Sequence, residues 1–202
     1  MPAEFDYYLL NWSAGTPYMR DVMLHFRRLI MRKVILGLAV SLDGFIEGPN
    51  GEYDWCFTDQ DYGMSDFLNR IDGLFIGRKS YELSLTMGDA TMPGFPKLRE
   101  YVFSNTLKEL KPGAILIRGG IEAEVKRIKK EQGKDIWLFG GASLTASLLN
   151  LNLIDEIGLA IHPIILGGGK PLFQDVFKRI ELKLVDAKTY STGLVSLTYH
   201  LK

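Results

Sequence analysis

The chain has 202 residues, with 24 Lys and Arg against 24 Asp and Glu, 47% hydrophobic residues and one cysteine. These values are typical of a single soluble globular domain, and they exclude a disordered, collagen-like or coiled-coil chain. The balanced charge lacks the basic surplus that nucleic-acid binding requires, and a lone cysteine excludes a disulfide scaffold.

The sequence favours a protein that is neither exported nor inserted in a membrane. No apolar run approaches the roughly 20 residues of a membrane span, and the first residues lack the basic and apolar regions of a secretory signal. We therefore expect a cytoplasmic protein without a membrane or nucleic-acid partner. Cys56 is expected to be a small buried hydrophobic residue rather than a reactive thiol.

Residues 1–30 differ in character from the rest of the chain. Aromatic residues are followed there by a stretch rich in helix breakers, and residues 18–30 have the pattern of a short amphipathic helix. Met31 stands just before the first core strand. We expect residues 31–202 to form the domain and residues 1–30 to be an extension of unknown role: an oligomer arm, a dispensable segment or the product of a start codon assigned too early.

Strands and helices alternate after Met31. The strands are expected at 34–40, 74–76, 101–104, 114–117, 136–139 and 157–161. The first is apolar throughout, as in a strand that is buried on both faces. Alternating residues at 181–190 and 194–201 predict a C-terminal β-hairpin.

Helices are expected between these strands. Thr58 or Asp59 can cap a helix whose apolar stripe ends at Ile71, and a later helix is expected to end near Gly133. Further helices begin after Gly77 and after Gly141. Crossover helices with a mostly parallel sheet and an antiparallel edge predict an α/β fold.

Two strand-to-helix junctions carry the strongest local signals. Their residues are Gly77, Arg78, Lys79 and Ser80 at the first, and Gly140, Gly141, Ala142 and Ser143 at the second. A helix N-terminus with bare backbone favours an anion, and an arginine fork suits a phosphate. Two such cradles on parallel strands suggest a dinucleotide, although each alone is also an ordinary turn. Neither has the Rossmann or Walker spacing.

Five blocks of sequence, taken in order, resemble the dihydrofolate reductase-like superfamily. They span 41–46, 76–82, 103–105, 137–144 and 163–173. Within it, the chain from Met31 to Lys202 is similar to stand-alone relatives of the C-terminal reductase domain of the bifunctional riboflavin-biosynthesis deaminase/reductase. The resemblance implies a three-layer α/β/α fold with a mixed, mostly parallel sheet and a C-terminal antiparallel hairpin. It also implies a homodimer that uses NADPH to reduce a small heterocyclic substrate, pterin-like or ribosylaminopyrimidine-like.

The resemblance also assigns residues to the cofactor. Gly77, Arg78, Lys79 and Ser80 would hold the 2′-phosphate and a neighbouring phosphate, with Ser104 near the adenosine. Gly140, Gly141, Ala142, Ser143 and Leu144 would hold the pyrophosphate, and Ala39 would face the nicotinamide carboxamide through its backbone. The residue types agree, because an Arg-Lys pair suits a dianionic 2′-phosphate, whereas an NAD site prefers an acidic residue on the ribose.

Three carboxylates are candidates for the proton donor that hydride reduction needs. In dihydrofolate reductases a carboxylate on the helix before the Gly-Arg turn has this role, and Asp61 lies sixteen positions before Gly77, as that carboxylate does. Asp66 and Asp43 are the other candidates. Such a group is expected to be partly buried with a raised pKa. The alternative for Asp61 is that it complements the helix dipole.

Other residues are assigned to the substrate. Asp43 lies in the loop beside the cofactor, and Trp55 with Tyr53 forms either an aromatic wall over a flat ring or ordinary packing. The loop at 167–170 is either a third phosphate cradle or a mobile connection.

Several other activities are not expected. Three dispersed histidines make a metal site improbable, and the zinc ligands of a fused deaminase are absent from the sequence, so a dedicated role in riboflavin synthesis is not implied. The rival to a reductase is an NADPH-binding dimeric module without turnover.

Overall fold

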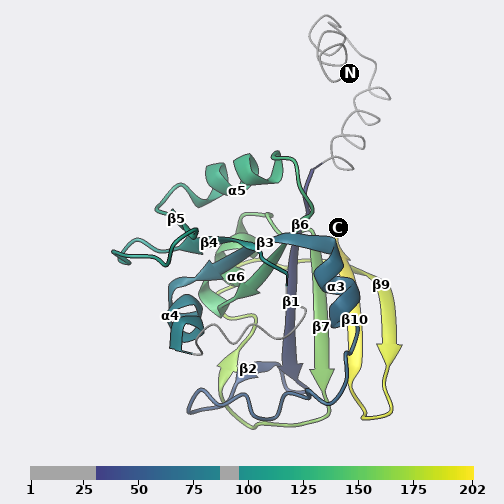
Figure 1. The fold of residues 1–202 in the computed structure, drawn as a ribbon. Coiled ribbons are helices and arrows are strands. Elements are labelled where there is room, and N and C mark those ends of the chain that lie inside the picture. Colours follow the sequence, from purple (N-terminus) through teal and green to yellow (C-terminus); the bar gives the residue numbers. More distant parts are fainter. Residues whose placement is uncertain (1–30, 87–95) are drawn as a thin grey trace, which may run out of the picture. The chain divides into compact units, whose positions relative to one another are not determined.

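An eight-stranded sheet forms the centre of the protein, in the strand order β5-β4-β3-β6-β1-β7-β10-β9 (Figure 1). The computed structural model describes residues 31–86 and 96–202, so the helix expected at 18–30 lies outside the described residues. The strands are β1 Val34–Ser41, β3 Ile71–Gly77, β4 Arg99–Phe103, β5 Ile115–Ile117, β6 Asp135–Gly140, β7 Glu156–His162, β9 Leu182–Thr189 and β10 Val195–Leu201. The boundary between extension and domain near Met31 stays a prediction.

The strand directions are those expected from the sequence. The six strands from β5 to β7 run parallel, whereas β10 is antiparallel to both β7 and β9. β1 lies between β6 and β7, and Val34, Ile35 and Leu36 at its start are fully buried, as its continuous apolar run predicts. The mixed sheet with a C-terminal antiparallel hairpin is therefore confirmed.

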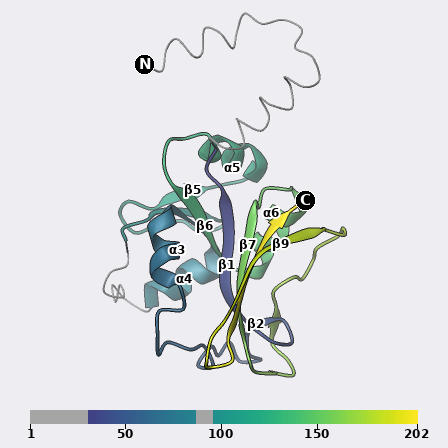
Figure 2. The ribbon, with the colours of Figure 1, turned by 90° about the vertical axis from the view of Figure 1, so that its right-hand side faces the viewer.

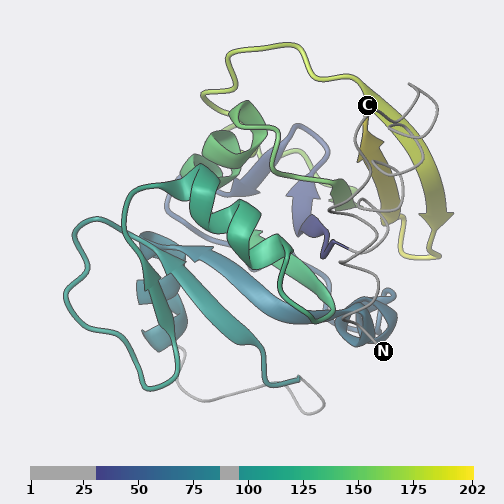
Figure 3. The same ribbon diagram turned by 90° about the horizontal axis from the view of Figure 1, so that it is seen from above.

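Helices cover both faces of the sheet. They are α3 Met64–Arg70, α4 Arg78–Thr86, α5 Ile121–Lys129 and α6 Ala142–Asn150. In Figure 2, α3 and α4 lie on one side of β1 and α6 lies on the other. Seen from above, α5 and α6 lie side by side on the same face (Figure 3). The result is the three-layer arrangement that the resemblance implies.

Two hydrophobic cores hold these layers together. Val125 of α5 and Leu148 of α6 pack with Leu36 and Leu138 of the sheet in the larger core. On the opposite face, Tyr81 of α4 packs with Ile76 and Val102. Burial of one such aliphatic side chain contributes about 1.5–3 kcal/mol, so these contacts stabilise the packing of the helices on the sheet.

The helix before β3 is shorter than expected. It begins at Met64, ends at Arg70 and leads directly into β3 at Ile71, so neither the cap at Thr58 or Asp59 nor the helical position of Ile71 was correct. Tyr62 and Gly63 have φ values of 51° and 85°, in the left-handed region, which ends any helix that approaches from the N-terminal side. Helix α5 also ends before Gly133, at Lys129.

A short ribbon lies apart from the main sheet and was not predicted. Strand β2, Phe45–Glu47, pairs antiparallel with β8, Lys170–Pro171, and the Nζ of Lys170 lies 3.0 Å from a carboxylate oxygen of Glu47. β2 has three residues and β8 has two, too few for an alternating pattern to be visible in the sequence.

An ion pair fixes the end of α3 against the sheet. The guanidinium of Arg70 donates to both carboxylate oxygens of Glu156 at 3.0 and 3.1 Å, and Glu156 is buried at the start of β7. The bonds to Glu156 raise the pKa of Arg70. Within the described ranges, no helix has the length and apolar character needed to cross a membrane.

Candidate functional site

The central ladder of the sheet opens between β1 and β6. Their last paired residues are Leu36 and Leu138, although β1 continues to Ser41 and β6 continues to Gly140. Over this length β1 stays paired with β7, and β6 stays paired with β3. The carboxyl ends of β1 and β6 therefore diverge, at the kind of position where open α/β sheets bind ligands.

The backbone of Ala39 faces this opening. The carbonyl of Lys33 accepts the N–H of Ile136 on the β6 side, and the carbonyl of Val34 accepts the N–H of Asp155 on the β7 side. Because backbone groups alternate sides along a strand, the N–H and C=O of Ala39 point toward β6. In the described part of the chain, no β6 residue pairs with Ala39. These two groups therefore face the opening, and their binding of a carboxamide stays a prediction.

The two strand-to-helix junctions touch one another beside the opening. A Cβ atom on Gly77 would lie 3.4 Å from the amide nitrogen of Gly141, and one on Gly141 would lie 3.3 Å from the Oγ of Ser80. Gly140 has a φ of 119°, which side chains rarely adopt, and the Gly140–Gly141 peptide bond is cis. The structure thus brings together two groups of residues that are separated by about sixty positions in the sequence.

The electrostatics of this paired junction favour an anion. Neither α4 nor α6 has an acidic residue in its first turn, and no side chain caps the N-terminus of α6. The guanidinium of Arg78 lies 3.5 Å from the carboxylate of Glu82, and both side chains are about half exposed. Lys79 is exposed and makes no ion pair with any residue that the structure describes.

The remaining predicted cofactor residues take different positions. The hydroxyl oxygen of Ser104, at the end of β4, accepts the N–H groups of Thr106 and Leu107 at 3.2 and 2.9 Å and so shapes the loop that follows. Ser143 is exposed on the first turn of α6. The side chain of Leu144 is buried in the larger core, so only its backbone can face a ligand.

Asp61 lies outside the helix on which the resemblance would place the proton donor. It precedes α3, where its carboxylate accepts the N–H of Gly63 at 3.0 Å, the N–H of Ser65 at 2.9 Å and the hydroxyl of Ser65 at 2.7 Å. These bonds, that of the Ser65 hydroxyl first, lower the pKa of Asp61. The carboxylate thus satisfies an N–H in the first turn of α3, as a capping group does, although it lies two residues before the N-cap Gly63. The direction of the pKa shift is opposite to the one expected for an acid. The other helical candidate, Asp66, is exposed on α3.

Asp43 holds two loops together at the carboxyl end of β1. Its carboxylate accepts the hydroxyl of Ser41 at 2.7 Å and the N–H groups of Leu166 and Gly167 at 3.2 and 2.8 Å. The bond from Ser41 is the main cause that lowers the pKa of Asp43. The glycine loop at 167–169 is thus tied to the loop after β1, and most of the acceptor capacity of Asp43 is used within the protein.

An aromatic group gathers around His162, the last residue of β7. Trp55 and Phe57 contact its ring, and Tyr62 contacts the ring of Tyr190 in the turn of the hairpin. Trp55 is partly exposed beside the end of β1. The sequence indicated no role for His162, because nothing local shows that residues about one hundred positions apart meet here.

Neither the lone cysteine nor a metal ion is expected to take part in the chemistry of the site. Burial, with a contribution from Asp54, raises the pKa of the Cys56 thiol to about 11, so the thiolate is disfavoured. Among the residues that the structure describes, no group of three His, Cys, Asp or Glu side chains could hold a metal ion.

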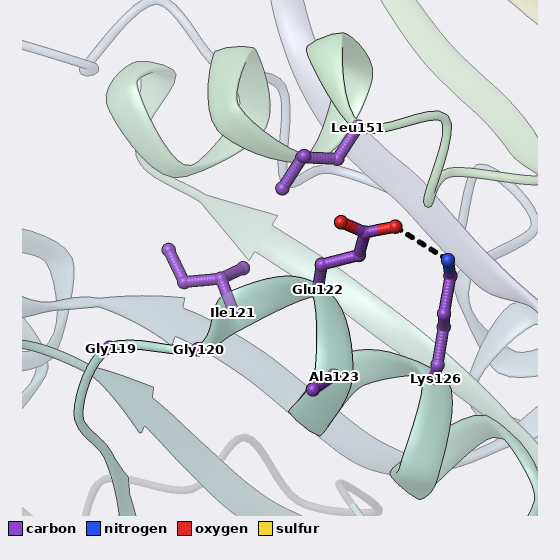
Figure 4. Close-up of a pocket in the computed structure, with 7 residues that line it drawn as sticks. All are labelled: Gly119, Gly120, Ile121, Glu122, Ala123, Lys126 and Leu151. Carbon is purple, nitrogen blue, oxygen red and sulfur yellow. Dashed lines mark hydrogen bonds and ion pairs between the residues drawn. The ribbon is translucent and has the colours of Figure 1, made fainter.

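A shallow hollow lies between the start of α5 and the end of α6. It is lined by Gly119, Gly120, Ile121, Glu122, Ala123, Lys126 and Leu151 (Figure 4). Glu122 and Lys126 form an ion pair of 2.5 Å across one side of it. The hollow contains none of the predicted site residues, and Leu151 follows the end of α6 opposite to Gly141.

Comparison with known proteins agrees with this geometry. A family model described as the RibD C-terminal domain matches residues 32–196. The uncharacterized protein YyaP of Bacillus subtilis is 50% identical over 181 residues, which cover 85% of this chain and 96% of that protein. YwjB of the same organism, also uncharacterized, is 33% identical over 169 residues, which cover 81% of this chain and 95% of that protein.

Solved structures show the same fold. A putative riboflavin biosynthesis protein from Shewanella has a TM-score of 0.75 at 28% identity, with 84% of this chain and 99% of that chain covered. Dihydrofolate reductase from Enterococcus faecalis, in complex with NADP(H), has a TM-score of 0.61 at 15% identity, with 84% and 96% covered. The resemblance seen in the sequence is confirmed: the chain belongs to the RibD C-terminal domain family, a family of reductase domains with the dihydrofolate reductase-like fold.

Proposed function

We propose that the protein is an NADPH-dependent reductase that transfers a hydride to a small heterocyclic substrate of the pterin or ribosylaminopyrimidine type. The observation that carries the proposal is the opening between β1 and β6, which lies beside two touching helix starts and is faced by the free backbone groups of Ala39. The family of reductase domains to which the chain belongs supports it.

The residues present fit a dinucleotide with a 2′-phosphate. Arg78 and Lys79 would neutralise that phosphate, and the backbone of Gly140 and Gly141 with the first turn of α6 would hold the pyrophosphate. Ala39 would bind the carboxamide. When bound there, the nicotinamide supplies the hydride, while the protein supplies binding, orientation and exclusion of water.

The substrate would lie on the face of the sheet that carries α3 and the aromatic group around His162. A partly exposed indole at Trp55 offers a flat apolar surface for a heterocycle. Asp61 and Asp43 both have lowered pKa values, so each is a carboxylate at neutral pH that can accept an N–H from a ligand. The role of Asp61 as proton donor stays a prediction, and the geometry favours the cap.

The proposal is tested by following NADPH oxidation against a panel of pterins, ribosylaminopyrimidines and flavins. Oxidation that depends on one of these compounds supports the reductase. Binding of NADPH without oxidation across the panel would favour the alternative, a dimeric binding module without turnover. The homodimer itself is proposed from β9, an edge strand that is exposed along all eight of its residues.

A further inference from the structure

His162 has both of its ring nitrogens engaged. Its Nε2 accepts the backbone N–H of Phe57 at 3.0 Å, and its Nδ1 lies 3.0 Å from the carbonyl oxygen of Ala160. A carbonyl can only accept, so Nδ1 carries the hydrogen, and Nε2 must be bare to accept from Phe57. The contacts therefore specify one neutral tautomer of His162, a residue that is 2% exposed.

The same ring also packs against two aromatic side chains. The ring centroid of Trp55 lies 5.3 Å away at an interplanar angle of 82°, and that of Phe57 lies 5.0 Å away at 58°. The residues between β2 and α3 form no helix or strand of their own. His162 thus supplies a bond and a packing surface that hold residues 55–57 against the sheet.

The held residues lie against the carboxyl end of β7, beside the end of β1. His162 pairs with Ser41, the last residue of β1, two positions after Ala39. Trp55 is therefore fixed at the carboxyl end of β7, the strand next to β1, whose other edge borders the opening toward β6. A loop that carries a binding residue must be positioned by a rigid element, and here that element is the end of β7.

We propose that His162 is a positioning residue whose neutral imidazole holds residues 55–57 so that Trp55 forms one wall of the substrate site. Its link to the substrate rests on the proposed function, whereas the hold on Trp55 is measured without any substrate. Protonation would place a hydrogen on Nε2, opposite the N–H of Phe57, and the bond would be lost.

The surroundings of the ring keep it neutral. Burial lowers the pKa of His162 below its ordinary value of 6.5, and the bond to Ala160 opposes this in part. No charged group contributes to the shift. The titratable side chains nearest in sequence to the contacts of the ring are Asp54 and Cys56, on either side of Trp55, and Asp43, which binds Ser41. The same loop also carries Glu52, Tyr53, Asp59, Asp61 and Tyr62. Release of the loop is therefore expected only as the pH falls through a value below 6.5.

Two substitutions separate the hydrogen bond to Phe57 from the protonation of His162. In His162→Gln the side-chain oxygen can accept the N–H of Phe57 and does not titrate, whereas His162→Leu fills the space without an acceptor. His200→Gln is the matched control, because His200 is the other histidine that the structure describes and it lies beside Glu156, away from the loop.

The test uses the full chain labelled with 5-fluorotryptophan, and the fluorine resonance of Trp55 is assigned with Trp55→Phe. The wild type and His200→Gln should show that resonance shift as the pH falls through a value below 6.5, and His162→Gln should not. In His162→Leu the resonance should be displaced at every pH. With a substrate from the panel, KM should rise roughly two- to tenfold in His162→Leu and be restored in His162→Gln, with unchanged NADPH affinity.

A Trp55 resonance that is independent of pH in the wild type, or unchanged in His162→Leu, would overturn the positioning role. If His162→Leu does not fold, the comparison of the wild type with His162→Gln still decides. A normal fluorine titration with no substrate found in the panel would count against the proposed function and leave the hold on Trp55 established.

Discussion

A Cβ atom on Gly77 would come within 3.4 Å of the amide nitrogen of Gly141, so the turns that start α4 and α6 are in contact. This separation is an ordinary van der Waals distance, and Gly77→Ala is expected to fold with nearly unchanged stability. The added methyl group would occupy space over which a phosphate approaches bare backbone. We expect NADPH affinity to fall about tenfold, equal to about 1.4 kcal/mol, measured by fluorescence titration. Unchanged affinity would remove the junction from the cofactor site.

Arg78→Gln tests the preference for the 2′-phosphate. Loss of a charge-assisted contact costs about 1.5–3 kcal/mol, so NADPH binding should weaken about ten- to a hundredfold while NADH binding stays the same. Arg179→Gln is the control, because Arg179 is an exposed arginine after β8 and outside both junctions. An equal loss of affinity for NADPH and NADH would show that Arg78 does not recognise the 2′-phosphate.

Asp61→Asn distinguishes a capping role of Asp61 at the start of α3 from a role as proton donor. Asparagine retains one acceptor oxygen but no charge at the start of α3, so we expect a lower melting temperature and a retained rate of NADPH oxidation per folded molecule. Because the folded-state pKa of Asp61 lies below its ordinary value of 3.8, its stabilisation is present above that value and is lost as the pH falls through the folded-state pKa.

The difference in melting temperature between the wild type and Asp61→Asn should therefore vanish in acid. The matched variant is Asp66→Asn, on the first turn of α3 and without these hydrogen bonds. Abolished turnover in Asp61→Asn, with normal folding and cofactor binding, would instead establish Asp61 as the proton donor.

Arg70→Ala tests the ion pair that fixes α3. The substitution leaves the carboxylate of Glu156 buried at 5% side-chain exposure, with Lys33 and His200 at 4.0 and 3.5 Å as its remaining partners. We expect the free energy of unfolding to fall by about 1.5–3 kcal/mol, measured by urea denaturation at constant m-value. A change as small as that of the exposed control Arg179→Ala would show that the pair contributes little.

Leu184→Lys tests the proposed homodimer. Leu182 and Leu184 lie on the same face of the edge strand β9 and are 37% and 51% exposed, and a lysine there discourages pairing of edges. Light scattering after gel filtration should give a dimer for the wild type and a monomer for the variant. A monomeric wild type at all concentrations would contradict the proposal.

The strands of the sheet could be predicted from the sequence where burial gives a continuous apolar run or an alternating pattern. The buried β1 and β6 read as continuous apolar runs, and the hairpin reads as alternation, so strand identity and the fold could be predicted. The limits of α3 could not, because the left-handed backbone of Tyr62 and Gly63 depends on how residues 59–63 dock against the hairpin turn: the hydroxyl of Tyr62 bonds to Thr192 at 3.2 Å.

Some features of the candidate site could also be predicted from the sequence, and others could not. Glycines and cations at helix starts are local, so both junctions were found, but the contact between Gly77 and Gly141 and the direction of the Ala39 backbone arise only from strand order. The hold of His162 on Phe57 joins residues about one hundred positions apart. The capping role of Asp61 depends on hydrogen bonds that a count of positions cannot show.

Thermal unfolding of the full chain with NADPH and with NADH tests the central claim most directly. A ligand present at about 100 times its dissociation constant stabilises the folded state by about 2.7 kcal/mol. We expect NADPH to raise the melting temperature more than NADH does at equal concentration. The rise with NADPH should be smaller in Gly77→Ala. No rise with either cofactor at millimolar concentration would contradict it.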